Sequence, residues 1–134
     1  MQTISNVPVE NISNCLVTAF EGGSNYWYEI AEEHRPINFN NTPAEDRQFK
    51  HISYPMNEGG SLVITLSEDM RAEEGNEDED PETWTLNLET IAKGLEVMKS
   101  KHKSHYDDMV NENDDSTTGD VLLQCCLFGE VIYG

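Results

Sequence analysis

Carboxylates are the chemically active groups that dominate this chain. Its 134 residues contain 26 Asp and Glu but only 8 Lys and Arg, which gives a formal net charge of −18. About 2–8 charges keep a small domain in solution, and a larger excess repels itself and destabilises a compact fold. A basic partner would relieve this repulsion, so the composition predicts a protein that binds a positively charged surface.

The acidic residues concentrate in two segments, which supply the candidate binding groups. Nine of the sixteen residues at 67–82 are acidic, and a second group spans 107–115. Duplex DNA presents a comparable row of charges, about one per 1.7 Å of its axis. We therefore interpret the segments as a mimic of nucleic-acid phosphates, directed at a basic protein that handles nucleic acids. The candidate partner-binding residues are Glu68, Asp69, Glu73, Glu74, Asp107, Asp108, Glu112, Asp114 and Asp115.

The same residues also admit a simpler interpretation. Runs of like charge are commonly disordered or merely solvated, and no aromatic or β-branched residue interrupts 67–82. Composition therefore predicts a mobile acidic loop at 67–82. Carboxylates in such a loop would lack the fixed spacing of phosphates, so the mimicry hypothesis depends on whether they are ordered.

Clustered carboxylates and histidines can bind metals, but neither cluster in this chain has a complete ligand set. Residues 111–120 resemble a calcium loop that lacks the glycine at its sixth position and the glutamate at its twelfth. His102 and His105 have helical i, i+3 spacing, yet a structural zinc site needs four ligands. The sequence therefore predicts no metal site and no cofactor.

The chain lacks the usual signatures of an enzyme. It contains no Gly-x-Ser-x-Gly, P-loop, Gly-x-Gly-x-x-Gly or Cys-x-x-Cys motif. Cys15, Cys125 and Cys126 are odd in number and lie in apolar runs, where burial raises the pKa of a thiol. We predict reduced, buried thiols, a cytosolic protein and no enzymatic activity.

Tyr26, Trp27 and Tyr28 form the densest aromatic cluster, directly after Gly22 and Gly23. Tyr and Trp dominate binding hot spots, so these three are a candidate aromatic surface or a stacking platform for a nucleotide. We favour the other interpretation, a core strand, because large aromatic side chains are usually buried. Direct binding of nucleic acid is not expected, since tracking its backbone requires basic residues.

The apolar pattern predicts an α+β fold in which a small antiparallel sheet is packed on one face by about three helices. A single domain over 1–134 accommodates it. A turn at 57–60 suggests a hairpin between the two strands beside it, and the polar residues 31–48 are expected to form a loop. The predicted strands are 25–30, 49–54, 61–66 and 83–86.

Two helices are predicted from apolar residues at helical spacing. The first spans 8–21 and ends at Gly22, where glycine favours the left-handed stop. The second begins at Leu88 with Asn87 as its N-cap and follows Ile91, Leu95 and Met98, while its extension to Tyr106 and Met109 is left open. The acidic residues 111–116 then separate this helix from the last one.

The last helix is expected to begin at Thr117 or Thr118 and to end at Gly129. Its residues 121–128 are apolar on nearly every side, which is typical of a helix at the centre of a core. The tail 130–134 is apolar and should dock on that core or pair with a second subunit. No segment approaches the roughly 20 apolar residues of a membrane span.

Two segments of the chain have distinctive sequences. One is Asn11–Ile12 followed by Ala19–Tyr28, which contains EGGSNYWY, and the other is GDVLLQCCLFGEVIYG at 119–134. Both, together with residues 86–91, resemble a family of small, mostly uncharacterised bacteriophage proteins. The resemblance implies a phage gene product that acts inside a bacterial cell, and it supplies no catalytic residue.

The combined expectation is a phage-encoded inhibitor in the cytoplasm of the bacterial host. It would be of the anti-defence or anti-CRISPR type, binding a basic nucleic-acid-handling protein through DNA mimicry by surface carboxylates. The alternative is a small-molecule-binding protein that sequesters a nucleotide defence signal, or a structural accessory phage protein. In that alternative, residues 22–28 and the apolar C-terminus share a pocket or an oligomer interface. An anionic nucleotide needs cations, and those outside the long helix are Arg35, Arg47, Lys50 and Arg71.

Overall fold

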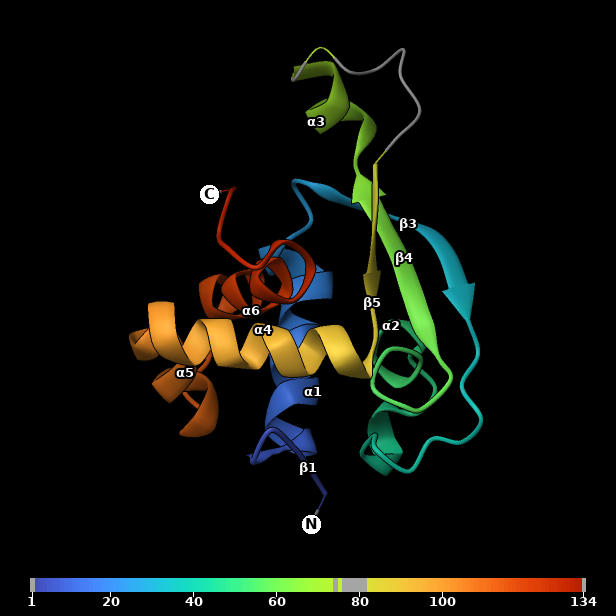
Figure 1. The fold of residues 1–134 in the computed structure, drawn as a ribbon, viewed down its shortest axis with the longest axis vertical. Coiled ribbons are helices and arrows are strands. Elements are labelled where there is room, and N and C mark those ends of the chain that lie inside the picture. Colours follow the sequence, from blue (N-terminus) through green and yellow to red (C-terminus); the bar gives the residue numbers. More distant parts are fainter. Residues whose placement is uncertain (1, 74, 76–81, 134) are drawn as a thin grey trace.

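The computed structural model describes residues 2–73, 75 and 82–133, which form a layer of helices beside a small sheet (Figure 1). This arrangement confirms the predicted α+β class. In chain order the elements are β1 (Thr3–Ile4), β2 (Val7–Pro8), α1 (Val9–Thr18), the π-helix η1 (Ala19–Gly23), β3 (Tyr28–His34), the 3-10 helix η2 (Ala44–Asp46), α2 (Lys50–Ser53), β4 (Ser61–Leu66), α3 (Glu68–Glu73), β5 (Thr83–Leu86), α4 (Leu88–Lys101), α5 (Lys103–Val110) and α6 (Ser116–Phe128).

The three-stranded sheet has β4 at its centre, with β3 and β5 antiparallel on either side. Ile64 of β4 is fully buried and pairs with Ile30 on one side and Trp84 on the other. Strand β5 lies next to α4 and α6, whereas β3 forms the edge farthest from these helices (Figure 1). The strands predicted at 61–66 and 83–86 are therefore confirmed.

The predicted hairpin between 49–54 and 61–66 is wrong, because α2 takes the place of its first strand. Ile52 and Ser53 of this helical turn are adjacent in sequence and both buried, whereas adjacent residues of a strand point to opposite faces. The turn closes on Phe49, whose carbonyl oxygen accepts a hydrogen bond from the Ser53 N–H at 2.8 Å. Strand β4 pairs with β3 instead.

The strand predicted at 25–30 begins three residues later and runs from Tyr28 to His34. Trp27 stays outside it because its indole N–H donates to Asp120 of α6. Strand β3 thus extends into residues expected to be a loop, and a β-bulge between Ile30 and Glu32 interrupts its pairing with β4.

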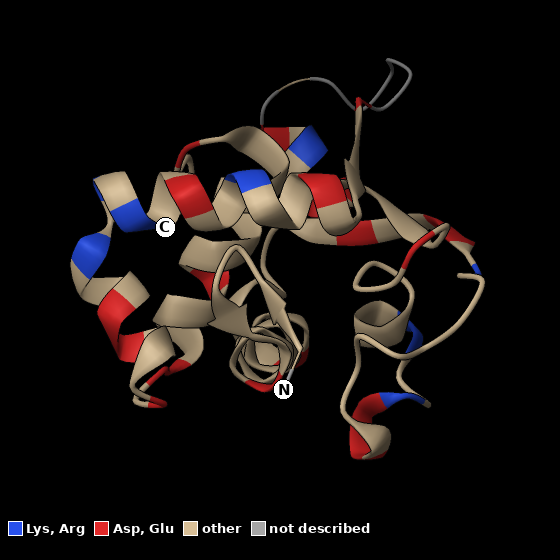
Figure 2. Cartoon of the chain, turned by 60° about the horizontal axis from the view of Figure 1, so that its bottom comes forward, with Lys and Arg blue, Asp and Glu red and all other residues tan. Residues whose placement is uncertain are grey.

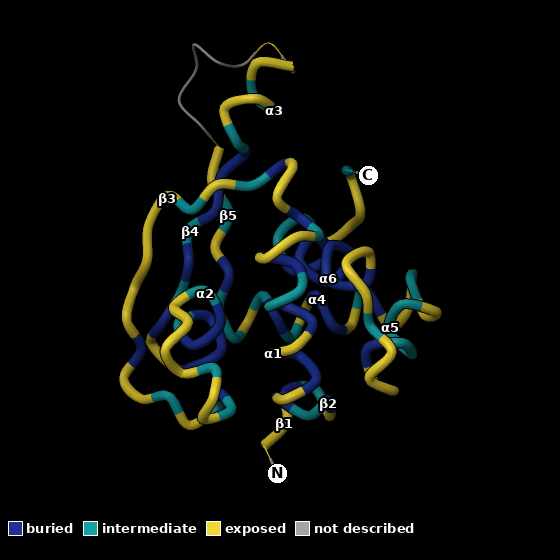
Figure 3. Tube along the Cα trace, turned by 180° about the vertical axis from the view of Figure 1, so that it is seen from behind, coloured by how far each residue is buried: buried dark blue, intermediate teal, exposed yellow. Residues whose placement is uncertain are grey.

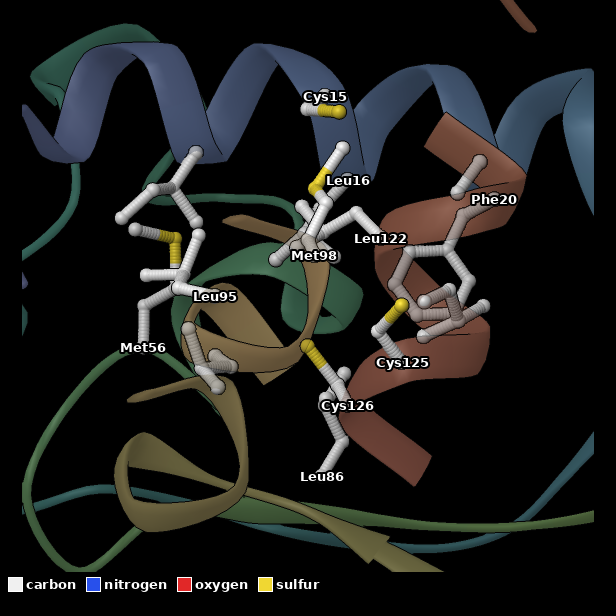
Figure 4. Close-up of a cluster of buried hydrophobic side chains, with 14 of the residues drawn as sticks. Cys15, Leu16, Phe20, Met56, Leu86, Leu95, Met98, Leu122, Cys125 and Cys126 are labelled. Atoms are coloured by element: carbon white, nitrogen blue, oxygen red, sulfur yellow. The ribbon is translucent and has the colours of Figure 1, made fainter. Parts of the chain in front are cut away.

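Helix α6 occupies the centre of the core, as its apolar sequence predicts. All its residues from Thr118 to Cys126 are buried, and α1 and α4 both pack against it. Figure 4 shows the sulfur-rich contact, in which Cys126 lies among side chains such as Leu16 of α1 and Met98 of α4. Seen from behind, the buried residues lie along these three helices and the central strand (Figure 3).

The ends of α6 follow from local hydrogen bonds. The N-cap is Asp115 rather than Thr117 or Thr118, because the Asp115 carboxylate accepts the Thr118 N–H at 2.9 Å. At the other end Gly129 adopts the left-handed conformation with φ of 72°, which confirms it as the predicted stop.

The helix predicted from Leu88 is α4, and the region considered as its extension to Met109 forms a separate helix, α5. The start of α4 is as expected: Asn87 accepts the Thr90 N–H, and Thr90 Oγ1 accepts the Asn87 N–H, forming a capping box. The division occurs at His102, whose φ of −135° and ψ of 52° are not helical. Helix α5 turns there and packs against α1 and α6.

The acidic segment 67–82 is not a loop throughout, because residues 68–73 form the helix α3. The backbone N–H of Arg71 donates to the carbonyl oxygen of Ser67 at 3.0 Å. The backbone N–H of Ser67 donates in turn to the carbonyl oxygen of Trp27 at 2.8 Å. The helix is thus joined to the start of β3. The rest of the predicted mobile loop, at 74 and 76–81, lies outside the described residues.

The contact between α4 and α6 depends on Gly94. A Cβ at this position would lie 2.6 Å from Cys126 Cα and 2.7 Å from Cys126 N, which is closer than packed atoms approach. We expect Gly94→Ala to lower the free energy of unfolding by about 1–3 kcal/mol, although alanine by itself favours a helix. Urea unfolding measures the difference.

The matched control is Gly22→Ala, because a Cβ there meets no atom within 4 Å. This variant should unfold at the same urea concentration as the natural protein or slightly higher. If Gly94→Ala were as stable as Gly22→Ala, the close approach of α4 to α6 would be contradicted.

Candidate functional site

A single carboxylate, that of Asp120, joins the N-terminal aromatic segment to α6. Its Oδ1 accepts hydrogen bonds from Ser24 Oγ and Trp27 Nε1, both at 2.8 Å, and its Oδ2 accepts one from Tyr26 Oη at 2.7 Å. Asp120 is buried, so these donors replace the water that the carboxylate loses on folding. The N-terminal aromatic segment and α6 are therefore neighbours in the fold.

Aromatic packing extends this contact to the C-terminal tail. The Trp27 ring is stacked on Tyr133, with centroids 5.8 Å apart, and lies 5.3 Å from Phe128. Gln124 of α6 binds the tail backbone: its Oε1 accepts the Ile132 and Tyr133 N–H groups at 2.8 Å, and its Nε2 donates to the Tyr133 oxygen. The tail therefore docks on the core, which was one of the two possibilities predicted for it.

Of the three predicted surface aromatics, only Tyr26 is exposed, at 45%. Trp27 is completely buried, and Tyr28 is half-buried with its hydroxyl donating to the Phe20 oxygen at 2.9 Å. The core interpretation therefore holds for Trp27, which lies beside rather than within a strand. Burial and the hydrogen bond to Asp120 raise the pKa of Tyr26, so its hydroxyl remains a donor at neutral pH.

A recess of about 270 Å³ lies beside Tyr26, where the alternative hypothesis expects a shared pocket. None of the described residues that line it is a Lys or Arg, and its charged group is the Asp120 carboxylate. An anionic nucleotide would find no counter-charge there. The lining residues are Gly22, Gly23, Tyr26, Ser116, Thr117 and Asp120.

Three of the predicted partner-binding carboxylates lie on α3. Glu68, Asp69 and Glu73 are exposed, and α3 stands beyond the end of the sheet (Figures 1 and 3). Asp69 and Glu73 are four residues apart, so they share a helical face and repel each other. The helix gives these carboxylates the fixed positions that a loop would not. Glu74 lies outside the described residues.

A second group of predicted carboxylates lies on α5 and in the turn that follows it. Asp107 and Asp108 are half-buried on α5, whereas Glu112 is exposed and Asp114 half-buried in the turn. Lys103 Nζ lies 3.0 Å from one Asp107 oxygen, so that carboxylate already has a partner. This group lies well apart from α3 (Figure 1). The structure therefore divides the predicted acidic surface into two.

Asp115 has a structural role that limits its use by a partner. Its carboxylate caps α6 through the Thr118 N–H, and the Thr118 hydroxyl also donates to it at 3.1 Å. These hydrogen bonds lower the pKa of Asp115, so it is ionised at neutral pH. A partner that bound it would compete with the cap.

Sequence reasoning missed a third acidic group, on the edge strand β3. Glu29, Glu32 and Glu33 are exposed there, on a strand whose start is joined to α3. Tyr28 and Ile30 alternate with Glu29, which was the available signal for a half-buried strand. The assignment of residues 31–48 to a loop concealed the other two.

The cations are unevenly placed. Four of the eight Lys and Arg residues lie on α4 and α5, where Figure 2 shows basic residues concentrated at the junction of the two helices. Ion pairs such as Lys93–Glu89, at 3.2 Å, are exposed and contribute about 0–1 kcal/mol each. The acidic residues of α3 and β3 lie on the other side of the molecule, away from this junction.

The described residues offer no metal site. Residues 2–73, 75 and 82–133 contain no group of three or more His, Cys, Asp or Glu side chains that could hold an ion. His102 lies between α4 and α5, and His105 Nδ1 is 3.2 Å from Thr118 Oγ1. Asp120, the last residue of the calcium-like segment, is turned into the core.

The three thiols are buried and free, as the sequence predicts. Burial raises the pKa of all three, that of Cys125 to about 11. Asp114 and Asp115 raise the pKa of Cys15 further. Almost no thiolate is therefore present at neutral pH, and these cysteines are poor nucleophiles in the folded protein.

Asp120→Asn tests whether the buried carboxylate holds the aromatic segment in place. An amide offers an N–H₂ group where an acceptor oxygen is needed, so at least one of the donors loses its partner. We expect a loss of about 3 kcal/mol in the free energy of unfolding, measured in urea. Glu130→Gln, which changes an exposed carboxylate near the end of α6, should alter it by less than about 0.5 kcal/mol. Equal stabilities of the two variants would contradict the role of Asp120.

The buried thiols lead to a second expectation. Iodoacetamide should modify the folded protein very slowly at mildly alkaline pH, because only thiolates react and few are present or accessible. After unfolding in guanidinium chloride all three cysteines should react, and mass spectrometry counts the added groups. Rapid modification of one cysteine in the folded protein would instead indicate an accessible, activated thiol.

No protein-family model, no curated protein and no solved structure matches this chain. Within the part of the chain that the structure describes, no helix is both long and apolar enough to cross a membrane. Function is therefore inferred from the chain's own side chains, above all from where the carboxylates lie.

Proposed function

We propose that this protein binds a basic, nucleic-acid-handling protein of a bacterial host through its exposed carboxylates and thereby excludes nucleic acid from it. The observation that carries the proposal is α3. Glu68, Asp69 and Glu73 are exposed on a helix that stands beyond the sheet, although like charges on one helical face are unfavourable. A basic partner surface would turn that repulsion into attraction.

The carboxylates of α3 and Glu29 of β3 support a single contact area, whereas Glu32 and Glu33 pair with Val63 and Leu62, farther from α3. The Ser67 N–H donates to the Trp27 oxygen, so α3 begins where β3 begins. Glu29 is the second residue of β3 and lies at that same end of the sheet, opposite Thr65. The carboxylates on α5 and the turn at 111–115 form a separate area, which would meet a different part of an extended partner.

Electrostatics would act mainly on the rate of association. A chain with a net charge of −18 attracts a basic protein over distances longer than direct contact. Such steering raises the association rate constant and weakens as salt is added. The proposed complex should therefore form quickly at low salt and dissociate readily at high salt.

The resemblance of residues 19–28 and 119–134 to small phage proteins supports a bacterial partner. A nuclease of a defence system, such as a CRISPR effector or a restriction enzyme, has the required basic groove. The proposed role is accordingly that of a cytoplasmic anti-defence inhibitor, not an enzyme. A nucleotide-sequestering role is less well supported, because no Lys or Arg lies among the described residues of the recess beside Tyr26.

The proposal is tested by charge reversal on α3. The triple variant Glu68→Lys, Asp69→Lys, Glu73→Lys changes exposed residues, so the fold should be retained. Tagged natural protein first captures partners from bacterial lysate at low salt, and high salt elutes them. With a recovered nucleic-acid-binding protein, we expect the α3 variant to associate at least about tenfold more slowly than the natural protein, measured by surface plasmon resonance.

A matched control separates position from total charge. Glu58→Lys, Glu96→Lys, Glu130→Lys reverses three other exposed carboxylates and gives the same net charge. This variant should associate faster than the α3 variant. Duplex DNA should compete with the natural protein for the partner. Equal rates for the two variants, or simultaneous binding of DNA and this protein, would contradict mimicry by α3.

A further inference from the structure

A groove of about 380 Å³ lies between η1, β3 and α2, and none of its lining residues lines the recess beside Asp120. Three parts of the chain form it: residues 17–21 from α1 and η1, Tyr28 and Glu33 from β3, and 48–52 around α2. Its lining residues are Val17, Phe20, Glu21, Tyr28, Glu33, Gln48, Phe49, Lys50, His51 and Ile52.

The walls of the groove are aromatic and held in place. The Phe20 ring makes an edge contact with Tyr28, with centroids 5.3 Å apart, and lies at the same distance from His51. The Tyr28 hydroxyl donates to the Phe20 oxygen at 2.9 Å, which fixes the orientation of its ring. Phe49 completes the groove and is 53% exposed. An exposed phenylalanine beside fixed rings offers a stacking surface without requiring the core to open.

The charged residues of the groove favour a cation. Glu21 and Glu33 are both exposed among its lining residues. Lys50 lies 3.9 Å from Glu33, but both side chains are solvent-accessible, so this long ion pair is weak and easily replaced. The net charge of −18 adds a favourable field for a positive ligand and an unfavourable one for a phosphate.

We propose that this groove binds an arginine side chain of the basic partner. A guanidinium group is planar, so it can stack on an aromatic ring while its N–H groups donate to carboxylates. Phe49 would supply the ring, and Glu21 and Glu33 would supply the acceptors. The inference rests on the proposed function, because it adds a specific anchor to a contact otherwise made by general attraction between charges.

The test uses the full chain and a defined probe, the peptide acetyl-Gly-Arg-Gly-amide. The same peptide with citrulline in place of arginine is the matched probe, since citrulline keeps the shape and loses the charge. In an NMR titration of the ¹⁵N-labelled protein, we expect the arginine peptide to shift the amide signals of Phe20, Tyr28 and Phe49. The citrulline peptide should shift them much less at equal concentration.

Two variants locate the binding. Phe49→Ala should lower the affinity for the arginine peptide about fivefold, the effect of losing one cation–π contact. Glu21→Gln should lower the same affinity about threefold, the effect of losing an exposed ion pair. Ile132→Ala and Glu96→Gln are the controls and should leave binding unchanged. Ile132 is 54% exposed, which matches Phe49, and both control residues lie outside the groove.

Each outcome decides for or against the groove. Shifts confined to the groove and reduced by Phe49→Ala support it. Equal binding of the citrulline peptide, or shifts spread over α3 and α5 that Phe49→Ala does not change, would overturn the inference and leave the proposed function standing. Tighter binding of adenosine monophosphate than of the arginine peptide would also overturn it. Groove binding without any nucleic-acid-binding partner in the lysate would instead refute the proposed function.

Discussion

The buried carboxylate of Asp120 is the contact on which the positions of the other segments depend. It lies in the first turns of α6 and collects the Ser24, Tyr26 and Trp27 donors, which draws residues 24–27 out of the sheet and onto the helices. That placement decides where β3 can begin. Since α3 is joined through Ser67 to Trp27, the same carboxylate also determines where the proposed binding helix stands.

The protein separates its apolar residues, which form the core, from its acidic residues, which lie at the surface. Helix α6 gathers α1 and α4 into one core that contains three thiols and several methionines. Apart from Asp120, the described carboxylates lie at or near the surface. Folding stability is a small difference between large terms, so a core of this kind must offset the repulsion of many unpaired charges. Excess charge that weakens the free protein is consistent with selection for binding rather than for stability.

Sequence patterns predicted the core better than the surface. The all-round apolar character of 121–128 identified the central helix, and the β-branched run at 61–66 identified the central strand. Residues 49–54 mix Phe, Ile and Tyr and look like a strand, yet residues 50–53 form the helical turn α2, in which Ile52 and Ser53 are buried. Which carboxylates share a face was beyond sequence reasoning, because it depends on the tertiary contacts of α3 and β3. The groove around Phe49 was missed for the same reason.

The position of α6 has a consequence for how the chain is made. The N-terminal part of a growing chain emerges from the ribosome first, and domains generally fold as complete units during synthesis. Here α6 follows α1 and α4 in the chain, so these two helices emerge with apolar faces before the helix that covers them has been made. The core is complete only once α6 has emerged, and a large excess of acidic residues disfavours association of partly made chains until then.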